Sequence, residues 1–233
     1  MLPNFRIKND TMMFGRWSFY RIKVFYIFVS ILILTISLPA LAPGSFEEGY
    51  ELYKKGKYYE AETILLREKE LSPKNLDVYA VLGWIYLYTG RYVKAIEISE
   101  EGLKISSTDT RLITNIGRAY QYLKRYNDAI KYFQKSISMS PKYPYNYYYL
   151  GRVYLDMGKY ILAETAFSAA ISLKSDRYIF YMFRGEAYEK MGKYQDAEKD
   201  YKKALTLKPN DPRLKEALIR VISAQATSQQ GIE

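Results

Sequence analysis

The sequence predicts an all-α protein, a right-handed superhelical solenoid of antiparallel helix pairs preceded by one hydrophobic N-terminal helix. Two small residues recur every 34 residues without a slip, and a proline recurs at one phase in three units. A fixed period of this length means that each unit buries its apolar face only by stacking on its neighbours. The recurring residues are Gly49, Gly83, Gly117, Gly151 and Gly185, then Ala61, Ala95, Ala129, Ala163 and Ala197, and Pro73, Pro141 and Pro209.

Residues 144–177 show the helix pair most clearly. An apolar stripe at i, i+3, i+4 and i+7 predicts a first helix, and one at i, i+4, i+7 and i+8 predicts a second. The turn between them falls at residues 158–160, beginning with Gly158. The first stripe is Tyr147, Leu150, Gly151 and Tyr154, and the second is Ala163, Phe167, Ala170 and Ile171.

A 34-residue helix-turn-helix unit with small residues at its eighth and twentieth positions and proline at its thirty-second resembles the tetratricopeptide repeat. Tyrosine at the eleventh position of four units agrees with this family. The resemblance implies a superhelix with a concave surface that binds other proteins. It places five repeats within residues 43–211, at about 42–75, 76–109, 110–143, 144–177 and 178–211.

The two ends of the array differ from the middle. Ser45 followed by Glu48 is a capping box at the start of the first unit, which departs from the family pattern and is expected to be an atypical end cap. After Pro212, apolar residues at helical spacing predict a capping helix over residues 212–225. Residues 226–233 are expected to form a polar tail.

Upstream of the repeats, residues 24–42 form an uncharged apolar stretch, long enough to cross a bilayer. Residues 1–23 contain five basic residues and one acidic residue, so this segment is expected to stay in the cytoplasm with the repeats outside, periplasmic if the source is bacterial. The stretch is either a single-pass transmembrane anchor or a signal peptide. Cleavage near Ala42 would release a secreted or periplasmic protein, but Pro43 disfavours that cut.

Composition excludes several kinds of chemistry. The 233 residues contain no cysteine and no histidine, which removes disulfides, thiol nucleophiles, imidazole bases and zinc sites built on these residues. We therefore expect no catalytic, cofactor-binding or metal-binding residues and no small-molecule substrate. Residues 1–42 contribute +4 of the net charge of +10, and the rest is spread over helix surfaces, so nucleic acid is not an expected partner.

The resemblance implies that the second, fifth, sixth, ninth, twelfth and thirteenth positions of each unit line the concave surface. Aromatic residues and arginines at these positions are candidate partner-binding residues, because these types are enriched at binding hot spots. Packing between neighbouring helices would also explain several of them. The candidates are Tyr50, Trp84, Tyr88, Arg111, Arg118, Tyr122, Tyr145, Tyr148 and Arg152, with Asn115 and Tyr149 on the same wall.

The three candidate arginines indicate an acidic segment as ligand, with Trp84, Tyr88 and Tyr122 stacking on its apolar or aromatic side chains. The family clamps a C-terminal carboxylate with lysine and asparagine at set groove positions, and this pattern is missing here. Binding of a chaperone tail is therefore not expected.

These observations predict a non-enzymatic protein–protein interaction scaffold, exported and tethered to a membrane through residues 24–42. It would bind an extended peptide or a helix of a partner in its concave groove. The alternative is a soluble periplasmic or secreted assembly factor that self-associates through exposed helix faces. A role as activator of an enzyme subunit fits the same sequence features.

Overall fold

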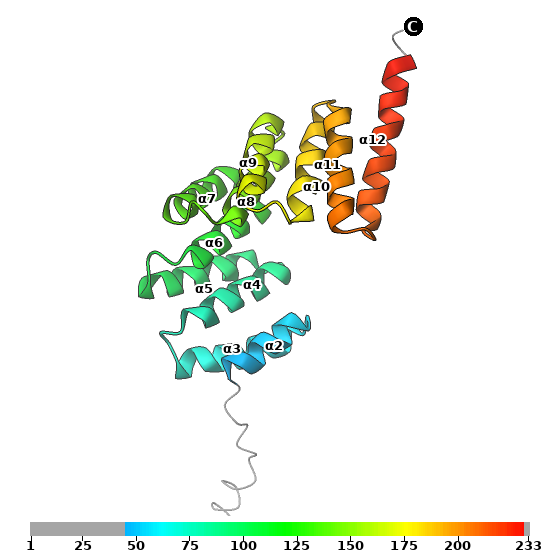
Figure 1. The fold of residues 1–233 in the computed structure, drawn as a ribbon. Helices are drawn as coiled ribbons and strands as arrows, with labels where there is room; N and C mark the ends of the chain where they lie inside the picture. Colours follow the sequence, from blue (N-terminus) through cyan, green and yellow to red (C-terminus); the bar gives the residue numbers. More distant parts are fainter. Residues whose placement is uncertain (1–44, 231–233) are drawn as a thin grey trace, which may run out of the picture. The chain divides into compact units, whose positions relative to one another are not determined.

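The computed structural model describes residues 45–230, which form eleven helices and no strands (Figure 1). The basic segment 1–23, the apolar stretch 24–42 and the predicted N-terminal helix lie outside the described residues. The helices are α2 (Phe46–Lys54), α3 (Tyr58–Leu71), α4 (Leu76–Tyr88), α5 (Tyr92–Ile105), α6 (Thr110–Tyr122), α7 (Tyr126–Met139), α8 (Pro144–Asp156), α9 (Tyr160–Leu173), α10 (Tyr178–Lys190), α11 (Tyr194–Leu207) and α12 (Pro212–Gln230).

The helices pack as consecutive pairs, and each pair contacts the next. The glycine at the eighth position of each unit makes this packing possible. A Cβ on Gly151 would lie 2.7 Å from Phe167, and one on Gly117 would lie 2.8 Å from Phe133. No side chain fits between these helices, so the glycine register sets the close approach. The predicted solenoid of helix pairs is confirmed for residues 45–230.

The turns inside the pairs are closed by residues with a left-handed backbone. Four of the five pairs use glycine here, with φ between 72° and 76°, and the third pair uses Lys124 with φ 58°. In the first pair the N–H of Lys57 donates to the carbonyl of Leu52, which satisfies a carbonyl at the end of α2. The turns therefore end each first helix within three residues and send the chain back along it.

The first helices of three units begin with a side-chain cap. The N–H of Glu48 donates to Ser45 Oγ at 3.3 Å, which is one half of the predicted capping box. Asn75 caps α4, and Asp109 caps α6 by accepting from the N–H of Arg111 at 2.9 Å. Pro144 opens α8, where the missing N–H costs nothing.

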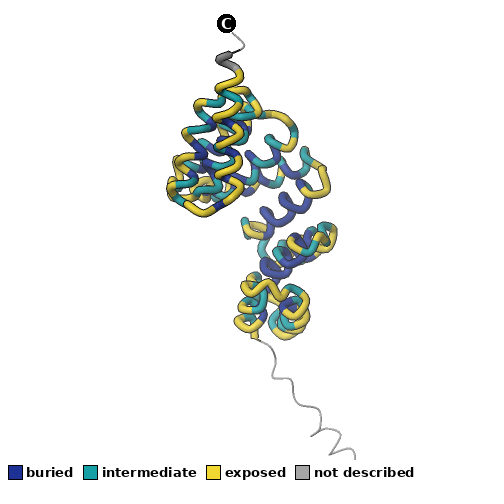
Figure 2. The backbone as a smooth tube through the Cα atoms, turned by 90° about the vertical axis from the view of Figure 1, so that its right-hand side faces the viewer, coloured by how far each residue is buried: buried dark blue, intermediate teal, exposed yellow. Residues whose placement is uncertain are grey.

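The core follows the first helices through the middle of the stack (Figure 2). In α4 and in α6, nine of the thirteen residues are buried, whereas α3 and α7 bury only two and three of fourteen. The central first helices contact neighbours on several sides, while the second helices keep one face in solvent. Positions in α4 and α6 are therefore fixed more firmly than those on the outer helices.

The last helix, α12, packs on α11, but no second helix follows it within the described residues to complete a pair. Leu214, Ala217 and Val221 are buried, whereas Ile219 is 67% exposed. Ile219 stands 34 residues after Gly185, at the phase where the preceding units have glycine. The helix reaches Gln230, beyond the predicted 212–225, so most of the predicted polar tail is helical.

None of the helices within residues 45–230 combines the length and apolarity needed to cross a bilayer.

Candidate functional site

A cavity of about 460 Å³ opens between the first helices of the N-terminal units. Residues from α2, α4 and α6 line it, together with the loop before α8 and one residue of α8. Each lining helix is the first of its pair, the class that the resemblance places on the concave surface. The lining residues are Tyr50, Tyr53, Trp84, Tyr88, Thr110, Arg111, Thr114, Asn115, Arg118, Ser140, Tyr143 and Tyr149.

One wall of the cavity is aromatic. Tyr53 lies at its centre, with its ring centroid 5.9 Å from that of Tyr50, 5.8 Å from Trp84 and 6.2 Å from Tyr88. Burial, followed by the proximity of Tyr88, raises the pKa of Tyr53, so its hydroxyl stays protonated near neutral pH. This wall provides neutral aromatic area with a few hydroxyl groups, a surface suited to apolar and aromatic side chains.

Arg118 forms the cationic part of the cavity. It is 9% exposed, and it is the only buried basic residue among those that the structure describes. Its guanidinium lies 5.0 Å from the ring centroid of Tyr149 and 5.7 Å from that of Tyr88. No carboxylate within the described part of the chain forms an ion pair with it.

The electrostatic surroundings of Arg118 consist of tyrosines. Burial disfavours its charged form, but the neighbouring oxygens of Tyr149 and Tyr88 hold the pKa of Arg118 above its ordinary value. Burial also raises the pKa of Tyr149 to about 12, so this neighbour is neutral at physiological pH. Arg118 is therefore a buried positive charge whose strongest electrostatic neighbours are tyrosines and not carboxylates.

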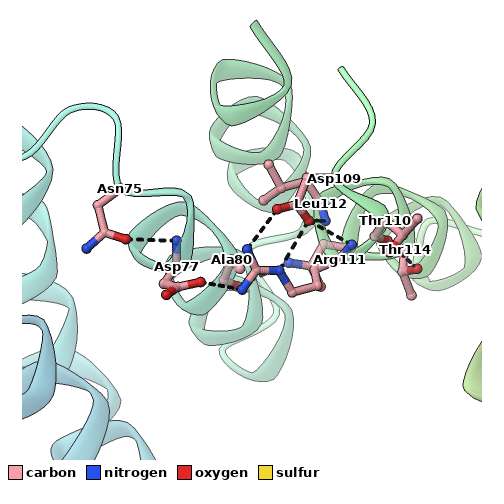
Figure 3. A network of polar contacts seen from close by, with 9 residues as sticks. Asn75, Asp77, Ala80, Asp109, Thr110, Arg111, Leu112 and Thr114 are labelled. Carbon is pink, nitrogen blue, oxygen red and sulfur yellow. Dashed lines mark hydrogen bonds and ion pairs between the residues drawn. The ribbon is translucent and has the colours of Figure 1, made fainter. Parts of the chain in front are cut away.

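Arg111 lines the same cavity but is differently engaged (Figure 3). Its guanidinium lies between Asp77 of α4 and Asp109 at the start of α6, bonded to Asp77 Oδ1 and, at 2.7 Å, to Asp109 Oδ2. The hydrogen bonds to Asp109 come first among the causes that raise the pKa of Arg111. Because two carboxylates already neutralise this arginine, it joins neighbouring units and offers less charge to a ligand.

Polar contacts below the cavity hold the first helices in place. Asn115 Nδ2 donates to the carbonyl of Ala80 at 3.1 Å, which joins α6 to α4. Thr114 Oγ1 donates to Asn146 Oδ1 at 3.2 Å, which joins α6 to α8. Asn146 is completely buried, so this link is shielded from water. These two hydrogen bonds thus fix the spacing between α4, α6 and α8, the helices that carry Trp84, Arg118 and Tyr149.

A second cluster continues the cavity along α8. Tyr148 is buried, and its hydroxyl accepts a hydrogen bond from Arg152 Nη1 at 3.2 Å. Arg152 also lies 4.3 Å from the ring centroid of Phe183. Tyr122 acts electrostatically on both Arg152 and Arg118, and its ring stacks on that of Tyr92 with centroids 4.8 Å apart.

The structure brings five of the nine candidate residues together at the cavity and places the other four beside it. The five are Tyr50, Trp84, Tyr88, Arg111 and Arg118, and the four are Tyr122, Tyr145, Tyr148 and Arg152. The structure adds Tyr53 and Tyr143, which the sequence interpretation did not single out. Tyr53 stands at the twelfth position of its unit, a concave phase, so its signal was present. Tyr143 is the last residue of its unit, outside the phases considered.

The cavity presents aromatic faces, hydroxyl groups, the amide of Asn115 and the guanidinium groups of Arg111 and Arg118. Within the described residues, no group of three acidic, histidine or cysteine side chains is placed to hold a metal ion.

Three models described as tetratricopeptide repeat match the chain, and together they span more than half of it. They match residues 76–109, 111–143, 132–165 and 178–211. No curated protein gives a significant match.

Solved structures show the same fold. The crystal structure of MamA protein is 28% identical, with TM-score 0.55 over 69% of this chain and 88% of that one. TTC0263, a thermophilic tetratricopeptide repeat protein of Thermus thermophilus, is 23% identical, with TM-score 0.67 over 78% of this chain and 97% of that one. The first repeat domain of Spaghetti (RPAP3), bound to the HSP90 peptide SRMEEVD, is 26% identical, with TM-score 0.50 over 52% of this chain and 96% of that one. The chain belongs to the tetratricopeptide repeat family.

Proposed function

We propose that this chain is a non-enzymatic scaffold that holds an extended segment of a partner protein in the groove between α2, α4, α6 and α8, with an acidic group of that segment at Arg118. The observation that carries the proposal is the state of Arg118, which is buried without an acidic partner among the described residues. Burying a charge is unfavourable unless it is paired. A carboxylate from a partner would supply the missing charge.

The aromatic wall supports the same reading. Trp84 and Tyr88 lie beside Arg118 in one cavity, so a ligand could place an apolar side chain and a carboxylate there together. Rigid aromatic area next to arginine is the combination found at binding hot spots. The related domain of Spaghetti binds a peptide that contains acidic residues, which shows that the fold can accept such a ligand.

Site-specific cross-linking tests this function. A photoreactive phenylalanine analogue is placed at Tyr88 in the groove or at Val93, which is 58% exposed outside it. In cells that express the full chain, we expect an adduct with a discrete partner from Tyr88, lost on Arg118→Leu. The charge-matched control Arg125→Leu removes an exposed arginine of an outer turn and should retain the adduct. An adduct that persists in Arg118→Leu would contradict the proposal.

We further propose that the scaffold is exported and tethered through residues 24–42, with the repeats outside. The support is the sequence of this stretch and its basic flank. Membrane fractionation and the intact mass of the mature chain test this. A membrane-bound species that retains residues 24–42 is expected. A soluble species beginning at Pro43 would contradict the tether and show that the chain is cleaved and released.

Self-association is a second candidate function, and exposed apolar residues on the outer helices favour it. Tyr59, Val93 and Ile161 share one phase, and they are 73%, 58% and 72% exposed. Scattered exposed apolar residues are ordinary, but here three of the five units repeat one at the same phase, with Asn127 and Gln195 in the other two, and these three define the row. If the row joins copies, the mass measured by light scattering should rise with concentration and fall to that of one chain in Ile161→Glu.

A further inference from the structure

The ninth position of the repeat changes its chemistry in order along the groove. The first two units have aromatic residues there, the next two have arginine, and the fifth has glutamate. These residues come from five successive first helices, so they form a row that crosses the units. The row is Tyr50, Trp84, Arg118, Arg152 and Glu186.

The two arginines of the row are not equivalent. The side chains that act most strongly on Arg118 are those of Tyr149, Tyr88 and Tyr122, and no carboxylate is among them. Arg152, by contrast, has the carboxylates of Asp156 and Glu186 among its electrostatic neighbours, although it forms an ion pair with neither. The first arginine therefore offers an unbalanced positive charge, whereas the second is offset by acids on α8 and α10.

The spacing of the row can be compared with that of an extended ligand. The first helices of neighbouring units contact one another. Packed helices lie about 8–10 Å apart, and an extended chain advances about 3.3 Å per residue. One step along the row thus corresponds to about three ligand residues. The row continues on both sides of Arg118, so a ligand chain can pass through and need not end there.

We infer, on the basis of the proposed function, that the groove selects an internal, extended partner segment with an aromatic residue about three residues from a single acidic residue. The aromatic residue lies against Trp84 and the acidic residue lies at Arg118. A second acidic residue placed about three residues further, toward Arg152, is rejected because Glu186 and Asp156 repel it. The groove therefore discriminates against polyacidic segments.

The inner position of Glu186 strengthens this discrimination. It is half-buried, and burial raises its pKa, with Arg152 opposing that rise. A carboxylate with such limited hydration, and with Arg152 as its strongest electrostatic neighbour, gains nothing from another anion. Replacing it with the isosteric amide removes the negative charge and leaves Arg152 available.

Synthetic peptides test the inference with the purified full chain in detergent solution. The peptides carry one phenylalanine and one glutamate in a serine-alanine background, separated by zero to five residues. Both ends are blocked, so that no terminal carboxylate contributes. Fluorescence anisotropy should show tightest binding at a separation of two residues, about tenfold tighter than for the same peptide with glutamine in place of glutamate. A second glutamate three residues beyond the first should weaken binding severalfold.

Two variants extend the test. In Glu186→Gln the second glutamate should no longer weaken binding, and it should strengthen it severalfold. Arg118→Leu should lose the preference for glutamate over glutamine, while Arg125→Leu should keep it. Thermal unfolding of each variant confirms that it is folded.

The outcomes separate this inference from the proposed function. Peptide binding that depends on Arg118 but is indifferent to spacing and to a second glutamate would overturn the inference and leave the groove function in place. Tightest binding for peptides with an unblocked C-terminus would show that the carboxylate comes from a chain end, which also overturns it. An absence of binding by every peptide, together with no Arg118-dependent adduct, would overturn both.

Discussion

The groove around Arg118 and the helix interface around Arg184 use the same residue type in opposite ways. Arg184 of α10 donates from Nε and Nη2 to the two carboxylate oxygens of Asp200 on α11, at 2.7 and 2.8 Å. It also donates to Ser168 Oγ of α9 at 3.0 Å, so it joins three helices. Arg118 has no such partner among the described residues and lies against tyrosine rings. Arg184, which joins helices of the stack, is neutralised by a carboxylate. Arg118, which lines the groove, has no described carboxylate as partner.

The largest effect is expected from breaking the pair at Arg184. Arg184→Leu leaves Asp200, which is 5% exposed, without its counter-charge. Removing one partner of a buried ion pair costs about 3–5 kcal/mol, so the free energy of unfolding should fall by that amount. Chemical denaturation monitored by circular dichroism measures it. Replacing both residues in Arg184→Leu/Asp200→Leu should recover most of the loss, and equal losses in the single and double variants would contradict the interpretation.

The same variant should show a defined pH dependence. Burial already raises the pKa of Asp200, against the opposing effect of Arg184, and loss of that cation should raise it further. A raised folded-state pKa favours proton uptake by the folded chain, so part of the lost stability should return as the pH falls from about 7 toward about 4. The difference in unfolding free energy between Arg184→Leu and the unaltered chain is followed across this range. A difference that grows on acidification would be inconsistent with this sign.

In contrast to Arg184→Leu, the variant Arg118→Leu should change stability little and weaken binding strongly. Its loss leaves no buried carboxylate unpaired, so the free energy of unfolding should change by no more than about 1 kcal/mol. Binding of the acidic segment should weaken by about 1.5–3 kcal/mol, the range for a hydrogen bond to a charged group. Denaturation and anisotropy are measured on the same preparation. A stability loss as large as that of Arg184→Leu would make Arg118 a structural residue.

The smallest effect is expected at Arg111. The side chains of Arg111 and Asp77 are 43% and 52% exposed, and a salt bridge at such a site contributes about 0–1 kcal/mol. The side chain of Asp109 is 9% exposed, but without the arginine side chain it still accepts from the N–H groups at the start of α6. Arg111→Ala should therefore lower stability by no more than this amount and weaken peptide binding less than Arg118→Leu does. The stability loss in Arg111→Ala should be smaller at high salt, because added salt screens exposed ion pairs. Equal binding losses in the two variants would place both arginines at the ligand.

The 34-residue register was enough to predict the solenoid of helix pairs, because the fold depends on a pattern repeated within one chain. The phase of Trp84 and Arg118 was enough to place them on one wall. The pairing of each arginine was not predictable in this way. Arg111 and Arg118 are seven residues apart and lie on the same face of α6. Only contacts across units show that Asp77 neutralises Arg111 and that no described carboxylate neutralises Arg118.

Tyr143 shows a second limit of the repeat pattern. It lies in the loop before α8 and reaches the cavity from outside the concave phases. Loop residues at unit boundaries follow local backbone geometry more than the helical period. The end of α12 was also not predicted from the pattern, because the apolar spacing fades before the helix ends at Gln230.

Ile219 constrains how this gene can lengthen. A 34-residue unit duplicated after α12 would bring a further second helix against that position, where glycine in the last three repeats leaves room for the rings of Phe133, Phe167 and Tyr201. The isoleucine side chain occupies that space. Copies inserted upstream of α12 would find the glycine register intact and would fold into it. A unit added within the described array therefore meets a glycine at this position, whereas a unit stacked on α12 would meet a branched side chain.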